Sequence, residues 1–555
     1  MLKNMNMFNW WSMTFFFSSM VMMILSMKML LFKKTIMMEW EMMKINSSEM
    51  YFTILIDWMS LMFMSTVMMI SSMILLYSSN YMGSNKNEQK RFYILMNLFI
   101  LSMMLMIMSP NLISIMLGWD GLGLVSYCLV IFYSSKKSYN AGMITCMTNR
   151  LGDIGILISI SWMMSYGSWH FIFYKEMMKE EMIYMLILSC FTKSAQMPFY
   201  SWLPEAMSAP TPISALVHSS TLVTAGVYLA MRFLSKTNMN YLLMMSIFTT
   251  MMASMCANYE FDLKKIIALS TLSQLGMMMS SIFLGMKEMS FLHLLTHATF
   301  KSLLFMCAGI MIFFNNNNQD IRNLSMINKT LPMTSSCFSI STLALCGMPF
   351  MSGFYSKDTI MENMSSNSTN MLSFLMMYTS LGLTMTYSTR TIYFLMMKQS
   401  KTKMKMKIKK IEKMKNSMII LAILSVSLGS LLMWTMNLNM KLPIITEKIK
   451  NYPIFMILMG MWMGVESFSF KKYIMSKSIQ SMNSKMWNMT SLMFKWQKNT
   501  FTISFKFKKL LNNEWGEFYG ASGTSTMLFL MSKNMMLSKN KTFLMSILIW
   551  MMMLM

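Results

Sequence analysis

Residues 193–221 read KSAQMPFYSWLPEAMSAPTPISALVHSST, and four of the nine prolines of the chain fall within fifteen of these residues. A second interrupted stretch, 344–358, reads ALCGMPFMSGFYSKD. Proline removes a backbone donor and breaks a helix, and both stretches lie within strongly apolar surroundings. Discontinuous helices at corresponding places in two halves of a membrane chain indicate a transport site near the bilayer midplane. A pair of ordinary turns between helices is the alternative.

The composition places the chain in a membrane. Of 555 residues, 55% are hydrophobic and 13% are charged, whereas a soluble domain is about 25% charged. The apolar residues come in runs of about 20, which predicts about fifteen or sixteen transmembrane helices in an all-α polytopic fold. The predicted stretches are 8–31, 51–78, 92–109, 111–133, 141–166, 183–205, 212–233, 241–257, 264–285, 290–314, 332–350, 354–363 merging onward, 371–397, 417–438, 452–469 and 543–555.

The net charge of +26 does not indicate nucleic-acid binding. Lysines crowd the loops between the apolar stretches, for example over 401–415, as expected when positive loops anchor a membrane protein. The seven cysteines never form a Cys-x-x-Cys pair, which argues against thiolate ligation of zinc or an iron–sulfur cluster.

The residue usage indicates the genome that encodes the chain. Only five of the 48 basic residues are Arg, and 88 residues are Met, as expected where the genome is AT-rich and ATA is read as Met in animal mitochondria. The first Arg is Arg91, so an Arg-rich transit peptide is not expected at the N-terminus. We therefore expect a mitochondrially encoded protein of the inner membrane.

A different element is predicted after residue 470. Apolar residues from Met475 to Trp496 are spaced alternately by four and three positions, and the pattern resumes from Ile503 to Leu510. This spacing predicts a long amphipathic helix that lies along the interface or along partner helices. The final apolar run, 543–555, is about 20 Å long as a helix and too short to cross about 30 Å unless the helix begins earlier.

The candidate functional residues are the ionisable residues within the apolar stretches. Each costs about 2.5–3.5 kcal/mol in the hydrocarbon and so requires a partner, water or a function. The candidates for a catalytic role in proton transfer are Asp120, Asp153, Lys193, His218, His293, His297, Lys301, Lys357 and Asp358.

In the first half of the chain, Asp120 is expected to be a buried carboxylate paired across helices with a cation, or else part of a purely structural ion pair. Arg150 and Asp153 can pair within one helix because they are three residues apart; Asp153 could also stand at the mouth of a proton route. Lys193 precedes the first interruption, and desolvation suits a buried lysine to reversible proton binding. His218 lies on a polar stripe that can hold water, although a satisfied core histidine is the alternative.

In the second half, His293, His297 and Lys301 lie on one helical face, each one turn after the last. Because the segment lacks the Glu of the metalloprotease motif and the lysine repels a cation, we expect a proton wire rather than a metal site. Lys357 and Asp358 follow the second interruption and are either an interfacial anchor or the last carrier before an exit.

Several cofactor classes are excluded by the motifs. Four scattered histidines cannot supply the facing haem ligands of an oxidase subunit or cytochrome b. Neither a P-loop nor a Gly-x-Gly-x-x-Gly after a strand is present in the sequence. We expect no cofactor and no metal on this chain.

The motifs resemble those of the chain 5 family of the membrane arm of mitochondrial NADH–ubiquinone oxidoreductase, complex I, which is related to subunits of multi-subunit sodium/proton antiporters. The resemblance covers about 110–395, and outside that range it is mainly one of layout. The matching motifs are LGWDGLGLVSY (117–127), NRLGDIG (149–155), KSAQ (193–196), WLPEAM (202–207), APTPISALVHSST (209–221), SQLG (273–276), HATFK (297–301) and GFYSKD (353–358).

The resemblance implies two inverted repeats, each with a broken helix, and a lateral helix. It implies N-terminal transmembrane helices over 1–109, a first antiporter-like half over 110–233, a second over 241–397, a basic loop over 398–416, additional transmembrane helices over 417–469, the lateral helix over 470–512 and a connector with an anchor helix over 513–555. Asp120 stands where most relatives have Glu, so its carboxylate is about one bond farther from any partner. Lys193 is the first-half lysine, His218 and Lys301 form the connecting relay, and Lys357 is the exit-side lysine.

The same resemblance implies the partners and the coupled reaction. Electron transfer from NADH through FMN and iron–sulfur clusters to ubiquinone is expected in other subunits of complex I, and proton translocation in this one. Neighbouring antiporter-like subunits, contacted through the lateral helix, and membrane lipids including cardiolipin are the expected partners, with no nucleic acid.

Two other functions remain open. One is a stand-alone sodium/proton antiporter subunit, which purification without NADH dehydrogenase activity would indicate. The other is a structural clamp, for which truncation after residue 470 would abolish assembly while Lys193→Ala and Lys357→Ala would have little effect.

Overall fold

The computed structural model describes residues 7–45, 48–82, 86–174, 177–234, 239–324, 327–366, 370–398, 412–436, 446–469, 477–484 and 486–554. Within these ranges, ten helices are long and apolar enough to cross a membrane. The chain divides into two compact units, Met1–Trp487 and Asn488–Met555. The protein is therefore a multi-pass and mostly helical membrane protein.

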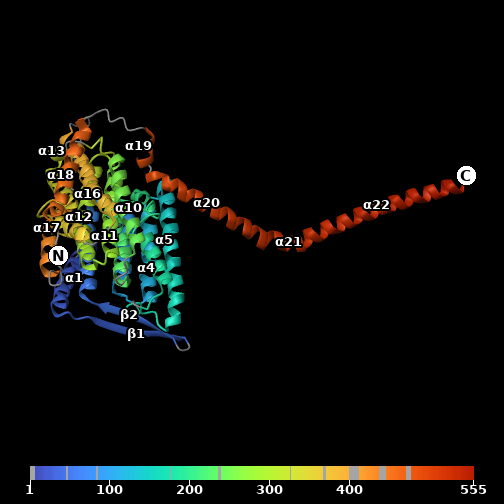
Figure 1. Ribbon diagram of the computed structural model, residues 1–555, viewed down its shortest axis with the longest axis horizontal. Helices are drawn as coiled ribbons and strands as arrows, with labels where there is room; N and C mark the ends of the chain where they lie inside the picture. The colour runs from blue at the N-terminus through green and yellow to red at the C-terminus, as the bar shows by residue number, and fades with distance from the viewer. Residues whose placement is uncertain are drawn as a thin grey trace. The chain divides into compact units, whose positions relative to one another are not determined.

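The first unit begins with a helix, a β-hairpin and two further helices. These are α1 (Met7–Phe32), β1 (Ile36–Ile45), β2 (Ser48–Ile56), α2 (Trp58–Tyr81) and α3 (Lys86–Met108). The strands are antiparallel, and the hairpin lies at one end of the helix bundle (Figure 1). The expectation of an all-α chain with a span starting at residue 51 was wrong here, because residues 51–56 belong to β2. Aromatic and β-branched residues on both strands favour this pairing, and Trp40 stacks on Phe52 across it.

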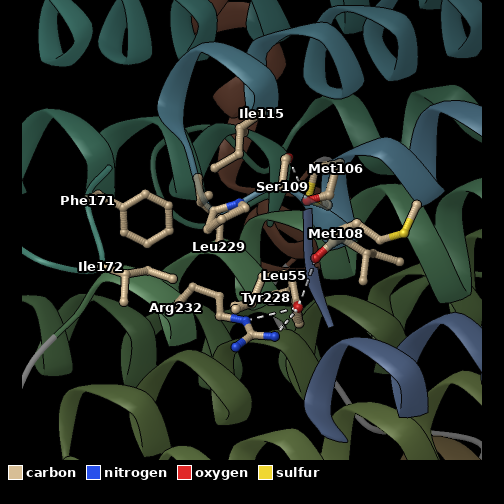
Figure 2. Close-up of a pocket in the computed structure, with 12 residues that line it drawn as sticks. Leu55, Met106, Met108, Ser109, Ile115, Phe171, Ile172, Tyr228, Leu229 and Arg232 are labelled. Carbon is tan, nitrogen blue, oxygen red and sulfur yellow. Dashed lines mark hydrogen bonds between the residues drawn. The ribbon is translucent and has the colours of Figure 1, made fainter. Parts of the chain in front are cut away.

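An ion pair ties the hairpin and α2 to a later helix. Asp57 caps α2, and its carboxylate accepts hydrogen bonds from both terminal nitrogens of Arg232. Arg232 also donates to the Tyr228 hydroxyl, which in turn donates to the Ile107 carbonyl at 3.2 Å. Figure 2 shows Arg232 beside Tyr228 at the edge of a pocket that Phe171 and neighbouring apolar side chains line. The pair therefore fixes the entry of α2 against two other helices.

Replacing Asp57 with Asn should destabilise the protein by about 3–5 kcal/mol, because it leaves the largely buried guanidinium without its counter-charge. Burial by itself would raise the pKa of Asp57, but the hydrogen bonds and charge of Arg232 outweigh burial and lower it. Since the folded-state pKa is lowered, the stabilisation is present above the ordinary pKa and is lost as pH falls through the folded value.

The measurement is the thermal unfolding of the purified complex at neutral pH. Asp320→Asn is the matched control, because its partner Arg322 has a side chain that is 54% exposed and an exposed pair contributes at most about 1 kcal/mol. Equal melting shifts for the two variants would contradict the prediction.

The first set of central helices contains the proline-rich interruption. It comprises α4 (Leu112–Val130), α5 (Lys136–Met163) with η2 (Met164–Tyr166), α6 (Glu180–Lys193), α7 (Trp202–Glu205), η3 (Ala206–Ser208), α8 (Thr211–Ile213), η4 (Ser214–Thr221) and α9 (Leu222–Phe233). The helix that ends at Lys193 does not resume until Trp202. This agrees with the interruption that the prolines predict.

The second set repeats this design. It comprises α10 (Asn240–Tyr259), α11 (Leu263–Phe283), α12 (Lys287–Phe314), α13 (Ile327–Thr330), α14 (Pro332–Cys346), α15 (Ser352–Ser366), α16 (Met371–Ile392) and η5 (Tyr393–Met397). α14 ends at Gly347 in the left-handed region and α15 begins five residues later. The second predicted interruption is therefore also present.

The predicted count of fifteen or sixteen spans exceeds the ten that the described residues provide. One reason is that the interrupted helices are short: α6 has 14 residues and α14 and α15 have 15 each, whereas a span needs about 20. α17 (Glu412–Met436) and α18 (Glu447–Ser469) follow. Most of the basic loop predicted over 398–416 lies outside the described residues.

The predicted lateral helix is divided. α19 (Lys477–Ser484) is followed by η8 (Met486–Asn488), in which all three residues have positive φ. α20 (Met489–Lys508) then continues through η9 (Lys509–Glu514) to α21 (Trp515–Tyr519). The prediction of one continuous helix from 475 to 510 was therefore wrong. Residues 470–476 lie outside the described ranges.

The last helix is longer than the final apolar run predicts. α22 (Ala521–Met553) has 33 residues, so residues 543–553 are the end of a helix that begins much earlier. Lys533, Lys539 and Lys541 lie within it, and it is not among the ten candidate spans. Its side chains are exposed in the second unit.

Candidate functional site

Charged residues of α4 and α5 form a cluster in the first set of helices. Arg150 Nη1 lies 3.2 Å from Asp153 Oδ2 and 3.8 Å from Asp120 Oδ1. The pairing of Arg150 with Asp153 within one helix is confirmed. The carboxylate of Asp120 is paired across helices as expected, but its side chain is 40% exposed rather than buried. Asp153 is the buried carboxylate, and Trp119 Nε1 donates to it at 2.8 Å.

Lys193 is fully buried beside this cluster. It is the last residue of α6, where the carbonyl end of the helix dipole stabilises a cation. Its Nζ donates to the Trp119 carbonyl at 3.4 Å and lies 4.8 Å from the centre of the Trp119 ring. Within the described part of the chain it takes part in no salt bridge. Trp119 thus contacts both Lys193 and Asp153.

His218 lies in the π-helical segment η4, which follows the interruption. π-Helical turns are rare and occur mostly at functional sites. The imidazole is 1% exposed, and neither ring nitrogen has a hydrogen-bond partner among the described residues. The indole of Trp202 is its aromatic neighbour, with ring centres 6.2 Å apart. Because η4 packs on α12, His218 stands between the first and second sets of helices.

α12 carries three buried ionisable groups in line. His293, His297 and Lys301 are each 0% exposed, and the two imidazole centres are 6.2 Å apart. Lys301 Nζ donates to Ser270 Oγ at 2.6 Å. The nitrogens of His297 have no partner among the described residues.

His293 connects α12 to two other helices. Its Nδ1 is 2.8 Å from Ser356 Oγ on α15, and its Nε2 is 3.2 Å from Gln274 Oε1 on α11. Since the amide oxygen of Gln274 can only accept, as assigned, Nε2 carries a proton in this geometry. The hydroxyl of Ser356 can either accept from or donate to Nδ1, so this contact tolerates both protonation states of the ring.

Lys357 follows Ser356 directly and is buried. Its Nζ donates to the carbonyl of Leu345, next to the last residue of α14. Its ammonium therefore lies at the carbonyl end of the interrupted helix, where a positive charge is favoured. Asp358 is partly exposed. Among the described residues it forms no salt bridge with Lys357.

Two glycines allow α15 to approach the end of α14. Gly347 has a φ of +79°, which side chains rarely adopt, and a Cβ on Gly353 would overlap the Ala344 carbonyl oxygen. Without these glycines the carbonyl end of α14 could not meet Lys357 in this way.

Gly353→Ala should therefore destabilise the second interruption by about 1–3 kcal/mol, the usual cost of overpacking. Thermal unfolding of the purified complex measures the loss. Gly382→Ala on α16 is the control, because the nearest atom to its added Cβ would be 3.4 Å away. Indistinguishable melting temperatures for the two variants would show that the close approach has no energetic weight.

The sequence reasoning missed the neutral partners of the site. Trp119, Ser270, Gln274 and Ser356 hold the ionisable groups, yet no role was predicted for them. A polar residue within an apolar stretch was the available signal, but serines are common in this chain and most of them bond to their own helix. Across the described residues, no group of three or more His, Cys, Asp or Glu side chains could hold a metal ion.

Comparison with a solved structure defines the class of protein. The chain superposes on the structure of the Mrp complex from Dietzia sp. DQ12-45-1b with a TM-score of 0.73 at 20% identity, covering 88% of this chain and 57% of that one. The fold is thus that of Mrp antiporter-like membrane subunits.

Sequence comparison defines the family. Residues 40–93 match the chain 5 N-terminus of NADH-ubiquinone oxidoreductase (complex I), residues 109–384 match the NADH:quinone oxidoreductase/Mrp antiporter transmembrane family, and residues 387–555 match the C-terminus of NADH dehydrogenase subunit 5. NADH-ubiquinone oxidoreductase chain 5 of Aedes aegypti is 44% identical over 96% of this chain and 95% of its own, and that of Locusta migratoria is 44% identical over 92% and 93%. The chain belongs to the NADH–ubiquinone oxidoreductase chain 5 family and is a proton-pumping subunit of the membrane arm of complex I.

Proposed function

We propose that protons move through this subunit along a buried line of ionisable groups. The line begins at Asp153 and Lys193, passes His218, and continues along His293 and His297 to Lys301. It ends near Lys357 and Asp358. Asp120 and Arg150 bias the charge of Lys193 from the partly exposed side.

The observation that carries this proposal is the arrangement on α12. Three titratable side chains with 0% exposure lie on successive turns of one helix, a costly arrangement in a membrane unless it has a function. Hydrogen bonds of His293 to Ser356 and of Lys301 to Ser270 attach this line to the neighbouring helices.

Water is expected to complete the line at two histidines. The ring nitrogens of His218 and His297 have no partners among the described residues, and a buried polar group without a partner costs about 1–3 kcal/mol. Serine and threonine hydroxyls of η4 donate to backbone carbonyls of α8 and η4, so they leave the His218 nitrogens to water.

The energy of one ion pair at this site is comparable to the work of moving one charge across the membrane potential. An ion pair about 7 Å apart at an effective dielectric constant of 20 is worth about 2.4 kcal/mol. Moving one charge across 100 mV costs about 2.3 kcal/mol. Switching Arg150 between carboxylates, or changing the pairing of Lys193, is therefore comparable in energy to moving one proton against the membrane potential.

The setting of the proposal is the mitochondrial inner membrane. The animal relatives and the Met-rich composition support this location. NADH, FMN, iron–sulfur clusters and ubiquinone would be bound by other subunits, and α20 to α22 would contact neighbouring antiporter-like subunits. The division into N-terminal helices, two antiporter-like halves and a C-terminal arm remains part of the proposal.

Ser356→Ala tests the link between α12 and α15. Losing one hydrogen bond of about 1 kcal/mol should slow proton passage at this step about fivefold, while the complex still assembles. The measurement is proton uptake per NADH oxidised in proteoliposomes.

Ser365→Ala is the matched control on α15, because its hydroxyl donates to the Glu362 carbonyl of the same helix and Ser365 is not part of the proposed line. An unchanged proton yield and rate in Ser356→Ala, with normal assembly, would exclude a role for the His293–Ser356 contact in translocation.

A further inference from the structure

We propose that a phospholipid with an ethanolamine headgroup binds in the groove between α1 and α17. Two cavities lie along this groove. The four helices α1, α2, α12 and α17 contribute to both, and the residues that directly follow α1 contribute to the first. The headgroup cavity, of about 260 Å³, is lined by Leu30, Lys33, Lys34, Thr35, Trp58, Glu288, Thr435 and Met436. The acyl cavity, of about 80 Å³, is lined by Ser19, Met20, Met23, Ser65, Thr66, Met69, Ile70, Thr299, Leu424 and Leu428.

The two helices run in the same direction along the groove. Near their beginnings, Lys413 Nζ donates to Asn9 Oδ1 at 3.4 Å. Their ends meet again at the headgroup cavity, which Leu30 and Met436 both line. α2 packs against both helices and forms the floor between them.

The separation of the cavities matches one acyl chain. Met23 precedes Lys33 by ten residues, a helical rise of about 15 Å, and Leu428 precedes Met436 by eight, about 12 Å. The spacing along α1 and the spacing along α17 thus give nearly the same distance between the two cavities. Since the hydrocarbon core is about 30 Å thick, a chain whose headgroup lies at Lys33 would reach the acyl cavity near the bilayer midplane.

The charges of the headgroup cavity select the lipid. Lys33 and Lys34 provide two ammonium groups for a phosphodiester, and Glu288 provides one carboxylate. Within the described residues none of these three takes part in a salt bridge. The tryptophan Trp58 is of the type enriched at the membrane–water interface.

A headgroup with both signs of charge satisfies all three residues. The phosphate pairs with the lysines, and a primary ammonium donates to the Glu288 carboxylate. An anionic headgroup would leave Glu288 facing a negative charge, and a choline ammonium has no hydrogen to donate. Ethanolamine phospholipid is therefore the class that fits.

The bound acyl chain would contact α12, the helix that carries His293, His297 and Lys301. Thr299 lines the acyl cavity and lies between His297 and Lys301 on α12. The lipid would contact α12 on the face opposite to His297 and Lys301, because two residues turn an α-helix by about 200°.

Photo-crosslinking to the intact, delipidated complex tests the proposal. The probe is phosphatidylethanolamine with a diazirine near the middle of one acyl chain, and cross-linked peptides are identified by mass spectrometry. Labelling of peptides that contain Met20, Met23 or Leu424 is expected. Labelling spread over all exposed helices without enrichment there would overturn the site.

Paired variants test the headgroup contacts. Lys33→Gln with Lys34→Gln should raise the probe concentration needed for half-maximal labelling about 25-fold. This corresponds to about 2 kcal/mol, at about 1 kcal/mol per lysine. Lys136→Gln with Lys137→Gln, a second exposed lysine pair at a helix start, is the control and should leave it unchanged. Equal weakening by both pairs would show non-specific attraction and overturn the proposal.

Competition and cavity filling complete the test. Unlabelled phosphatidylethanolamine should compete better than phosphatidylcholine, phosphatidylglycerol, cardiolipin or inorganic phosphate, and Glu288→Gln should remove that preference. Better competition by an anionic lipid or by phosphate would overturn the headgroup assignment.

Leu424→Trp should fill the acyl cavity and block labelling, whereas Ile423→Trp, at a position that is 63% exposed, should not. Labelling that survives Leu424→Trp would exclude the acyl cavity.

Discussion

Lys301→Met should nearly stop proton passage through this subunit. Methionine fills a similar volume but cannot carry a proton, and Lys301 is the buried group between His297 and the Lys357 end of the line. Removing a positioned proton-transfer group usually slows transfer by about 10²–10⁴-fold. Proton uptake coupled to NADH oxidation in proteoliposomes measures the loss.

Assembly must be intact for this result to be interpretable. The main contact of the Lys301 amine is one hydrogen bond to Ser270, and the Ser270 hydroxyl itself donates to the Ile267 carbonyl. That hydroxyl stays bonded when the amine is removed, so the complex should still form on a native gel. Lys265→Met on α11 is the control, because Lys265 has a side chain that is 39% exposed and pairs with Asp262. Full proton translocation by assembled Lys301→Met complex would exclude the relay.

Truncation after Trp487 should abolish assembly of the membrane arm. In the second compact unit, Asn488–Met555, none of the side chains that the structure describes is buried. α22 alone extends about 50 Å over its 33 residues, with exposed apolar side chains along its whole length, among them Leu528, Phe543 and Trp550. Such a surface requires lipid or protein partners to cover it.

Native gels and subunit mass spectrometry of the truncated chain measure this effect. Lys193→Met provides the contrast, because it should impair translocation and leave assembly intact. If the truncated chain assembled normally, the C-terminal arm would have no role in holding partners. If Lys193→Met and Lys301→Met both left translocation normal, while truncation abolished assembly, the subunit would be a structural clamp.

Much of the fold follows from local sequence. Apolar runs of about 20 residues have few stable arrangements in a bilayer other than helices, and proline and glycine mark both interruptions. The charged site residues were likewise visible, because an ionisable group in an apolar stretch is rare and costly. The hairpin of Ile36–Ile56 was missed because residues 32–50 were left without an element and residues 51–56 were joined to the apolar run of α2 that follows them.

The partners of the site could not be predicted in the same way. The one expected cross-helix partner of Asp120 was an unspecified cation, and the structure provides Arg150, three residues before Asp153, for both carboxylates. The neutral residues that hold Lys193, His293 and Lys301 come from other helices, between 19 and 74 residues away in the sequence. Their serines, tryptophan and glutamine look like many others in the chain.

The sequence by itself determined that the chain crosses the membrane many times, where its helices break and which titratable groups lie within the apolar stretches. These properties depend on the transfer cost of each residue and on local backbone chemistry. Only the tertiary structure decided that Asp153 is the buried carboxylate, that His293 joins α11 to α15 and that Lys357 meets the carbonyl end of α14. Such contacts depend on how helices pack, and in a membrane that packing is set by close steric fit between helices rather than by a difference in polarity that the sequence displays.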